Sequence, residues 1–254
     1  MKLSVDEIKE RQKEHSDEAY KSRFRKGWQS LKESFIGDFI NYYPLKKAIS
    51  LLPFSLRGKT VLNICCGDGF EAEYLVKLGA KVTVSDISSE AVKAAKRRCP
   101  QVKGVLADAE NLPFKDENFD LVIVRAGLHH LPNPDKGISE MDRVSKQGFI
   151  FIEAQKNFIT KILIEIGLAE EYEESGNYVY RFTRKEIKTM MKKLKIRNFR
   201  IETVWCRYVE FLDKKIYPFL NNKFCLLVFK LFFFTFNSIF GYWGNTLTVV
   251  AWKH

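Results

Sequence analysis

Val61-Leu-Asn-Ile-Cys-Cys-Gly-Asp-Gly-Phe70 is the stretch of sequence that decides the fold. It begins with the apolar pattern of a buried strand, which Gly67 and Gly69 interrupt with a turn, and residues 71–77 then favour a helix. A strand that passes through a glycine-rich turn into a helix presents free backbone N–H groups and lets a ligand approach the backbone closely. The stretch therefore predicts a ligand-binding unit.

Strand and helix patterns alternate after this unit. Strands are expected over residues 60–65, 81–86, 102–107, 119–125 and 147–153, and helices over residues 70–78, 88–98 and 134–145. Such alternation with short connections is typical of a parallel sheet that is covered by helices on both faces. We therefore expect ligands at the carboxyl ends of the strands.

Acidic residues end the next two predicted strands. Asp86 ends the second strand, and Ala107-Asp-Ala-Glu110 ends the third. A carboxylate at the first position accepts hydrogen bonds from a ribose diol, and one at the second accepts from an adenine amine. Alternatively, Asp86 caps a helix that begins at Ser88 or Ser89, and Asp108 is only a turn residue. The joint spacing favours a nucleoside cofactor.

The residue between the two glycines distinguishes two kinds of nucleoside cofactor. A nicotinamide dinucleotide requires Gly-x-Gly-x-x-Gly, a pattern that tolerates Ala72 at the third position. Asp68 lies between the glycines, where a carboxylate repels a pyrophosphate and suits a cofactor with a cationic amine and sulfonium. On this argument we expect S-adenosylmethionine.

Five ordered segments together resemble the class I S-adenosylmethionine-dependent methyltransferases, especially the branch with ubiquinone/menaquinone-type and small-molecule enzymes. The segments are Val61-Leu-Asn-Ile-Cys-Cys-Gly-Asp-Gly69, Val84-Ser-Asp-Ile-Ser88, Ala107-Asp-Ala-Glu-Asn-Leu-Pro-Phe114, Asn118-Phe-Asp-Leu-Val-Ile-Val124 and Leu128-His-His-Leu-Pro-Asn-Pro134. The resemblance implies an α/β, Rossmann-like, seven-stranded sheet with six parallel strands, a last antiparallel strand and helices on both faces.

The resemblance also implies a set of cofactor-binding residues. The set is Asn63, Cys65, Gly67, Gly69, Asp86, Ile87, Asp108, Ala109 and Arg125. Gly67 and Gly69 would lie beside the methionine moiety, with Arg125 nearby. Asn63 and Cys65 depart from the family, which usually has Asp and Gly at these positions. Because Asn63 lacks the charge, a non-catalytic S-adenosylmethionine-binding or scaffold protein is the alternative.

Candidates for proton transfer lie after the fourth and fifth predicted strands. They are His129, His130 and Glu153. Imidazole exchanges protons near neutral pH, which suits removal of a proton from a hydroxyl or ammonium nucleophile. Alternatively, the His-His-Leu-Pro turn only shapes the cofactor loop. The expected product is S-adenosylhomocysteine, and no metal site is expected.

The chain of 254 residues carries a net charge of +11, which favours an anionic partner such as a phosphate-bearing substrate, a membrane surface or nucleic acid. An RNA methyltransferase is the weaker alternative, since no basic cluster interleaved with aromatic residues is found.

Five scattered cysteines predict reduced thiols, and residues 1–7 contain no apolar signal region. We therefore expect a cytoplasmic protein, peripheral at the inner face of a membrane.

Two regions flank or interrupt the methyltransferase domain expected over residues 56–254. Residues 1–55 predict a helical lid, with an amphipathic helix whose apolar positions run from Tyr20 to Phe35. Alternatively, this helix packs on the side of the central domain. Residues 155–182 predict an inserted substrate cap. A capping box at Thr183 then starts a helix to about residue 195, and strands are expected over residues 199–211 and 245–252.

The last insertion, residues 213–243, predicts an apolar helix. Lys223, Lys230 and Asn237 recur every seven residues and share one narrow face of it. Because Lys230 interrupts the apolar run, we expect a helix at a membrane interface, or one that closes over a lipophilic acceptor, rather than a membrane span. The alternative is a helix buried against the core or in a dimer.

Overall fold

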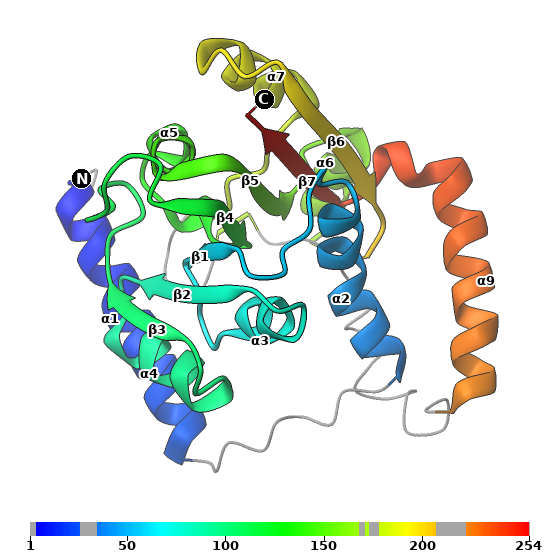
Figure 1. Ribbon diagram of the computed structural model, residues 1–254. Coiled ribbons are helices and arrows are strands. Elements are labelled where there is room, and N and C mark those ends of the chain that lie inside the picture. Colours follow the sequence, from blue (N-terminus) through cyan, green and yellow to red (C-terminus); the bar gives the residue numbers. More distant parts are fainter. Residues whose placement is uncertain (1–3, 26–34, 168–170, 173–177, 207–221, 254) are drawn as a thin grey trace.

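The computed structural model describes residues 4–25, 35–167, 171–172, 178–206 and 222–253, and its centre is a seven-stranded sheet (Figure 1). The strands are β1 (Thr60–Ile64), β2 (Lys81–Asp86), β3 (Lys103–Leu106), β4 (Phe119–Arg125), β5 (Ser145–Ala154), β6 (Asn198–Val204) and β7 (Thr246–Trp252). They lie in the order β3-β2-β1-β4-β5-β7-β6, and β7 pairs antiparallel with both neighbours. The predicted fold class is confirmed.

Helices cover both faces of the sheet because the buried strands present apolar side chains on both sides. One face packs against α5 (Pro134–Val144) and α7 (Arg184–Lys193), and the other packs against α2 (Phe35–Ser50), α3 (Phe70–Lys77) and α4 (Ser89–Arg98). The capping box predicted for α7 is present, since the Thr183 side chain accepts from the Glu186 N–H. This packing fixes the strand ends that carry the site.

The N-terminal region forms two helices with different neighbours. α1 (Val5–Arg25) lies beside α4, whereas α2 lies beside α9 (Lys223–Phe240) (Figure 1). The amphipathic helix predicted from Tyr20 to Phe35 is therefore only partly right, because α1 begins at Val5 and Phe35 starts α2. Trp28 and Leu31, which belonged to the predicted helix, lie outside the described residues.

Two insertions follow the regular part of the fold. The first contains α6 (Phe158–Glu165), and the second contains α9 and the short 3-10 helix η2 (Gly241–Trp243) that leads into β7. The strand predicted over residues 199–211 is too long: β6 ends at Val204, since the next N–H, that of Trp205, donates to Asn237 Oδ1 of α9 at 2.8 Å. Residues 207–211 lie outside the described residues.

Candidate cofactor and active site

The glycine turn after β1 is held by the carboxylate that ends β2. Gly67 N–H donates to Asp86 Oδ2 at 3.1 Å, and both glycines have positive φ, +50° for Gly67 and +78° for Gly69. A Cβ on Gly69 would lie 2.8 Å from the Cα of Ala95 in α4, so only glycine fits there. The turn is thus a rigid backbone surface at the carboxyl end of β1.

Asp86 links two turns. Besides Gly67 it accepts from the N–H of Ser88 at 3.0 Å, and burial raises the pKa of its carboxyl while these two N–H groups and the nearby His130 act in the opposite direction. The cap of α4 is Ser88, whose hydroxyl accepts from the Ala91 N–H. The alternative in which Asp86 itself caps that helix is therefore wrong.

Asp108 lies in the turn after β3, as the alternative interpretation of this residue predicted. Its Oδ1 accepts from the Glu110 N–H at 2.9 Å, and its Oδ2 accepts from Lys9 Nζ of α1 at 2.7 Å. Lys9 also pairs with Glu110 at 2.9 Å. Ala109 is buried in the core and Ile87 is half-buried after β2. Asp108 retains oxygen lone pairs for a further donor.

Asp68, between the glycines, is neutralised within the protein. Its carboxylate pairs with Arg98 of α4 at 2.5 Å and accepts from the Phe70 N–H. The expectation that Asp68 presents a negative charge to the cofactor is therefore wrong, because α4 supplies a cation that the local sequence did not indicate. The preference for a cationic cofactor has to rest on other residues.

Arg125, predicted near the methionine end, joins helices above the strand ends. Its guanidinium pairs with Glu71 of α3 at 3.2 Å, lies 3.5 Å from Asn41 Oδ1 of α2 and stands 5.3 Å from the centre of the Phe70 ring. Burial raises the pKa of Glu71, and the charge of Arg125 opposes that rise. Arg125 thus holds α2 against α3 at the edge of the site.

Glu153, His129 and the loop after β4 form one buried network. Glu153 is fully buried, and its Oε1 accepts from the N–H groups of Gly127 at 2.8 Å and Leu128 at 2.7 Å. Its Oε2 lies 2.7 Å from His129 Nδ1. With its oxygens used in this way, Glu153 orients the loop and the imidazole, so it is a positioning residue for His129.

The two histidines of η1 (Leu128–His130) lie together. Their ring centres are 4.1 Å apart, and His129 is buried whereas His130 is half-buried. The contact with Glu153 through Nδ1 fixes the orientation of the His129 ring.

Cys65 has the unusual φ of +46° at the end of β1, where the family pattern has glycine. A Cβ on Gly127 would lie 2.5 Å from the Cβ of Cys65 and 3.1 Å from its sulfur. The cysteine is therefore accommodated by a glycine on the neighbouring loop. Burial raises the pKa of the Cys65 thiol, which favours an uncharged side chain.

Helix α1 supplies contacts at three strand ends that the sequence analysis missed. Besides Lys9 at the end of β3, Asp17 accepts from the Ser88 hydroxyl and the Glu90 N–H after β2. The Tyr20 hydroxyl lies 2.8 Å from where a Cβ on Gly67 would be. These three residues share a helix face at i, i+8 and i+11, a signal that was present in the sequence.

The site offers acceptors for a cofactor that carries a cationic amine. Within the described residues, Asn63 Oδ1 at the end of β1 is fully buried and has no hydrogen-bond partner, although buried acceptors nearly always have one. Asp86 and Asp108 follow on the next two strands. One buried acceptor and two carboxylates along adjacent strand ends fit the amine, ribose and adenine of S-adenosylmethionine.

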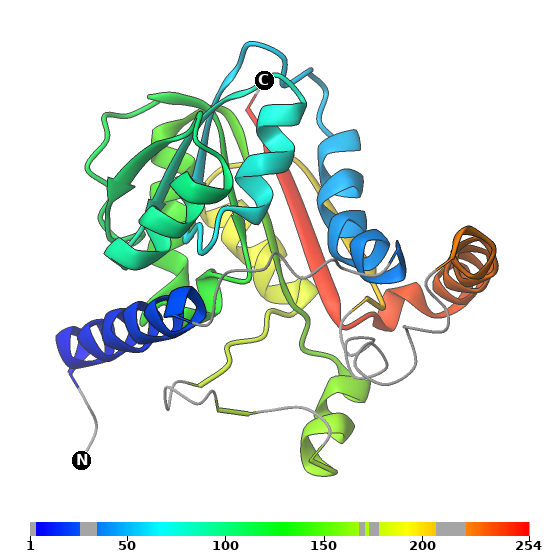
Figure 2. The same cartoon turned by 90° about the horizontal axis from the view of Figure 1, so that it is seen from below.

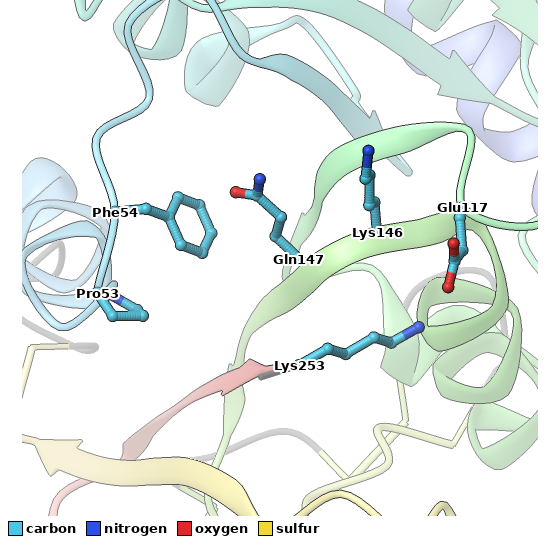
Figure 3. Close-up of a pocket in the computed structure, with 6 residues that line it drawn as sticks. All are labelled: Pro53, Phe54, Glu117, Lys146, Gln147 and Lys253. Atoms are coloured by element: carbon cyan, nitrogen blue, oxygen red, sulfur yellow. The ribbon is translucent and has the colours of Figure 1, made fainter.

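A separate hollow lies at the opposite edge of the sheet. It is bordered by residues at the amino ends of β4 and β5 and by Lys253 after β7 (Figure 3): Pro53, Phe54, Glu117, Lys146, Gln147 and Lys253. Lys253 Nζ donates to the carbonyls of Asp142 and Ser145. Since ligands of parallel sheets bind at the carboxyl ends, this hollow is not the candidate site.

Comparison with known proteins identifies the central part of the chain. Residues 62–152 match the family described as a methyltransferase domain. A demethylmenaquinone methyltransferase of Renibacterium salmoninarum is 36% identical over 98 residues, which are 39% of this chain and 41% of that enzyme. The match thus spans about two-fifths of the length of that curated relative.

Two other similar proteins are aligned over longer stretches. An uncharacterised protein of Methanocaldococcus jannaschii is 31% identical over 157 residues, or 60% of this chain and 72% of that protein. The structure of magnesium protoporphyrin IX methyltransferase of Synechocystis, with bound S-adenosylhomocysteine, has a TM-score of 0.62 at 17% identity and covers 95% of this chain and 98% of its own. At that identity the structural likeness shows the fold.

Proposed function

Because this chain belongs to the class I S-adenosylmethionine-dependent methyltransferases, we propose that it transfers a methyl group to a small or lipid-linked acceptor at a membrane surface. The observation that supports this most is the series of acceptors on adjacent strand ends. Asn63 lies in the last, turn-side part of β1, Asp86 ends β2 and Asp108 follows β3. S-adenosylhomocysteine is the expected product.

Each part of the cofactor has a proposed partner. The buried oxygen of Asn63 and the backbone at Gly67 and Gly69 bind the methionine moiety, Asp86 binds the ribose, and Asp108 binds the adenine amine. Cys65, Ile87 and Ala109 line the same strand ends. The face of α1 with Lys9, Asp17 and Tyr20 covers them as a lid, which the contacts of these side chains support.

The residues of this chain then orient the acceptor and remove its proton where it has one. The sulfonium of the cofactor supplies a methyl group that is already activated, so alignment of the nucleophile is the main task of the protein. His129 is the proposed base, and Glu153 orients its imidazole from 2.7 Å away at Nδ1. His130, half-buried and near Asp86, borders the same space.

An apolar, lipid-linked acceptor fits the surface beside the site. Exposed apolar side chains are concentrated on α6 and α9, and α9 with η2 is long and apolar enough to cross a membrane by length and composition. The relative from Renibacterium salmoninarum is named for a quinone acceptor, demethylmenaquinone. An isoprenoid quinol or a lipid-carried glycan precursor is the class of acceptor we propose, at the cytoplasmic face of a membrane.

Two measurements test the proposal. Isothermal titration calorimetry of the purified chain should show binding of S-adenosylmethionine and S-adenosylhomocysteine, and no binding of either would contradict the proposed function. Labelled methyl transfer into lipid, glycan and RNA fractions should then favour the lipid fraction. RNA-dependent incorporation would instead support an RNA methyltransferase, and cofactor binding without any transfer would support a non-catalytic binder.

A further inference from the structure

Helix α9 directs polar side chains toward the protein and apolar side chains outward, whereas a helix on the surface of a soluble protein does the reverse. Two of its polar residues face the protein: Lys230 Nζ lies 5.2 Å from the centre of the Phe39 ring of α2, and Asn237 Oδ1 accepts from the Trp205 N–H after β6. Lys230 interrupts the apolar run in the sequence, but it does not lie on the outward side of the helix. Phe233 alone among the helix's residues is buried, against α2 and β6.

The outward side of α9 is exposed and mostly apolar, with Thr235 and Ser238 as its polar residues. Six side chains that are half exposed or more lie along it, namely Phe224, Leu227, Val228, Leu231, Phe232 and Ile239, with exposed fractions of 50–73%. The hydroxyl of Ser238 on this side donates to the Thr235 carbonyl at 2.7 Å, so it is satisfied within the helix. Such a surface is poorly suited to water and well suited to hydrocarbon.

A second exposed apolar helix is attached to the end of the first. Asn157, the N-cap of α6, donates through Nδ2 to the carbonyls of Trp243 at 2.9 Å and Gly244 at 3.0 Å. Beyond this contact, α6 has exposed apolar side chains at positions i, i+4 and i+8. They are Phe158, Ile162 and, just after the helix, Ile166. We call the exposed apolar side chains of α6 and α9 together the α6–α9 surface.

The α6–α9 surface lies at the same edge of the sheet as the cofactor site. α6 follows β5, whose carboxyl end is beside that of β4, and η2 precedes β7, which starts at this edge because it runs antiparallel. Figure 2 shows α6 projecting from the sheet with the C-terminal end of α9 near its base, and α1 at the same edge. An acceptor leaving this surface would therefore enter near β4 and β5.

Cationic and aromatic side chains border the surface. Lys156 and Lys161 are exposed on and beside α6, Lys223 is exposed at the start of α9, and Arg184 lies 5.1 Å from the centre of the exposed Tyr242 ring. Tyrosine, tryptophan and lysine at the margin of an apolar surface are typical of a protein at the headgroup layer. The net charge of +11 adds attraction to an anionic leaflet.

We propose that the α6–α9 surface inserts into the interfacial layer of an anionic lipid leaflet and holds the carboxyl edge of the sheet against it. This inference rests on the proposed function, since it explains how a lipid-linked acceptor reaches the site without leaving the leaflet. Docking itself requires no catalysis. It therefore has its own test, which succeeds or fails independently of methyl transfer.

The connections of α9 favour insertion along the leaflet over a span across it. β6 and β7 are adjacent strands, and η2 returns the chain to β6, where Trp205 Nε1 donates to the Phe240 carbonyl. If α9 crossed the bilayer, the segment before it would have to cross as well. That segment carries Glu210, Asp213, Lys214 and Lys215 in its sequence, and such charges are costly in hydrocarbon.

The test is sedimentation of the purified full-length protein with preformed vesicles. We expect binding to phosphatidylcholine vesicles that contain phosphatidylglycerol, weaker binding to phosphatidylcholine alone, and release by high salt. The double substitution Leu231→Glu with Phe232→Glu should weaken binding about tenfold or more, because it places two charges in the inserted face. Both side chains are exposed, so the fold should survive, and circular dichroism checks this.

Lys146→Glu is the matched control, because one lysine replaced by glutamate changes the net charge by −2, as two new glutamates do. Lys146 is exposed at the amino end of β5, away from the surface, and this variant should retain most of the binding. Absence of vesicle binding by the wild type, or equal losses in both variants, would overturn the proposal. So would a dimer in solution that the α9 double variant converts to a monomer.

S-adenosylmethionine binding separates this outcome from the proposed function. A protein that binds the cofactor and methylates a lipid in detergent but ignores vesicles would overturn only the docking proposal. Vesicle binding without cofactor binding would overturn only the methyltransferase proposal. Binding that high salt cannot release would indicate a deeper insertion than the interfacial one proposed.

Discussion

The carboxyl edge of the sheet has two contrasting halves. In the cofactor half, at the ends of β1, β2 and β3, Asp86 and Asp108 have partners within the protein, and α1 contacts these strand ends through Lys9, Asp17 and Tyr20. In the acceptor half, beyond β5, α6 and α9 leave apolar side chains exposed and direct polar ones such as Lys230 inward. The two halves belong to one sheet and yet are suited to opposite environments.

The contrast agrees with the proposed function, in which one fold serves two partners of different solubility. A nucleoside cofactor is polar and arrives through water, so its half needs preorganised hydrogen bonds and a cover. A lipid-linked acceptor is apolar, so its half needs an exposed surface that a membrane completes. A substitution in one half should therefore leave the other half unchanged.

The largest effect is expected from Asp86→Ala. It removes a carboxylate that is proposed to accept from the ribose and that accepts from the N–H groups of Gly67 and Ser88, so affinity for S-adenosylmethionine should fall about 100-fold or more by calorimetry. Asp116→Ala, at an exposed carboxylate, should change it little. Vesicle binding should persist in both variants. An unchanged affinity in Asp86→Ala would mean that the ribose role is misplaced.

The next effect concerns Glu153→Gln. The amide oxygen still accepts from Gly127 and Leu128, but the amide N–H₂ now donates to Nδ1 of His129, which moves the imidazole proton to Nε2. We expect kcat to fall about 100-fold with cofactor affinity retained.

The pH profile distinguishes this effect from general damage to the loop. The deficit of Glu153→Gln should shrink as the pH rises, since a deprotonated acceptor needs no base. A loss that is uniform with pH, or a similar loss in the exposed control Glu117→Gln, would indicate that His129 has no role as a base.

A smaller effect is expected at the cover of the cofactor half. Lys9→Met removes the ion pairs with Asp108 and Glu110, so bound S-adenosylmethionine should dissociate about 3- to 10-fold faster in stopped-flow measurements. Lys13→Met on the same helix is the control, because Lys13 pairs with the exposed Glu10. Equal rates in the two variants would show that α1 does not retain the cofactor.

The smallest effect is expected at Cys65, where this chain departs from the family pattern. Cys65→Gly relieves the strain of a positive φ and should change the free energy of unfolding by less than about 1 kcal/mol, toward greater stability. Cys65→Ala keeps that φ and should bring no such gain in thermal denaturation. A marked loss of cofactor affinity in Cys65→Gly would reveal a direct contact of the thiol with the ligand.

Much of the cofactor half could be predicted because its signals are local. A strand that ends in glycines, and acids that end the next strands, follow from hydrophobic period and turn chemistry along a short stretch of chain. The sheet order and the site at the carboxyl ends follow from the handedness of β-α-β connections. The structure agrees with these predictions at β1 to β5 and at Asp86, which joins the glycine turn as a strand-end acid should.

The predictions that failed concern contacts between residues distant in sequence. Asp68 was expected to carry a free charge, but Arg98, thirty residues later, neutralises it. Glu153 is predicted to take part in the chemistry, and the structure adds that it accepts from the loop that begins at Gly127, which the sequence did not indicate. Nothing in the local pattern indicates which partner a charged side chain finds once helices pack.

The sequence by itself therefore determined the fold, the family and the positions of the strand-end acids, because these depend on periodicity and on residues close together in the chain. Only the tertiary structure decided which side of α9 faces outward, that α6 is tied to its end through Asn157, and that α1 lies over the glycine turn. The apolar run of the insertion was visible in the sequence. Its orientation was not, because the direction of a nearly all-apolar helix is set by what it packs against.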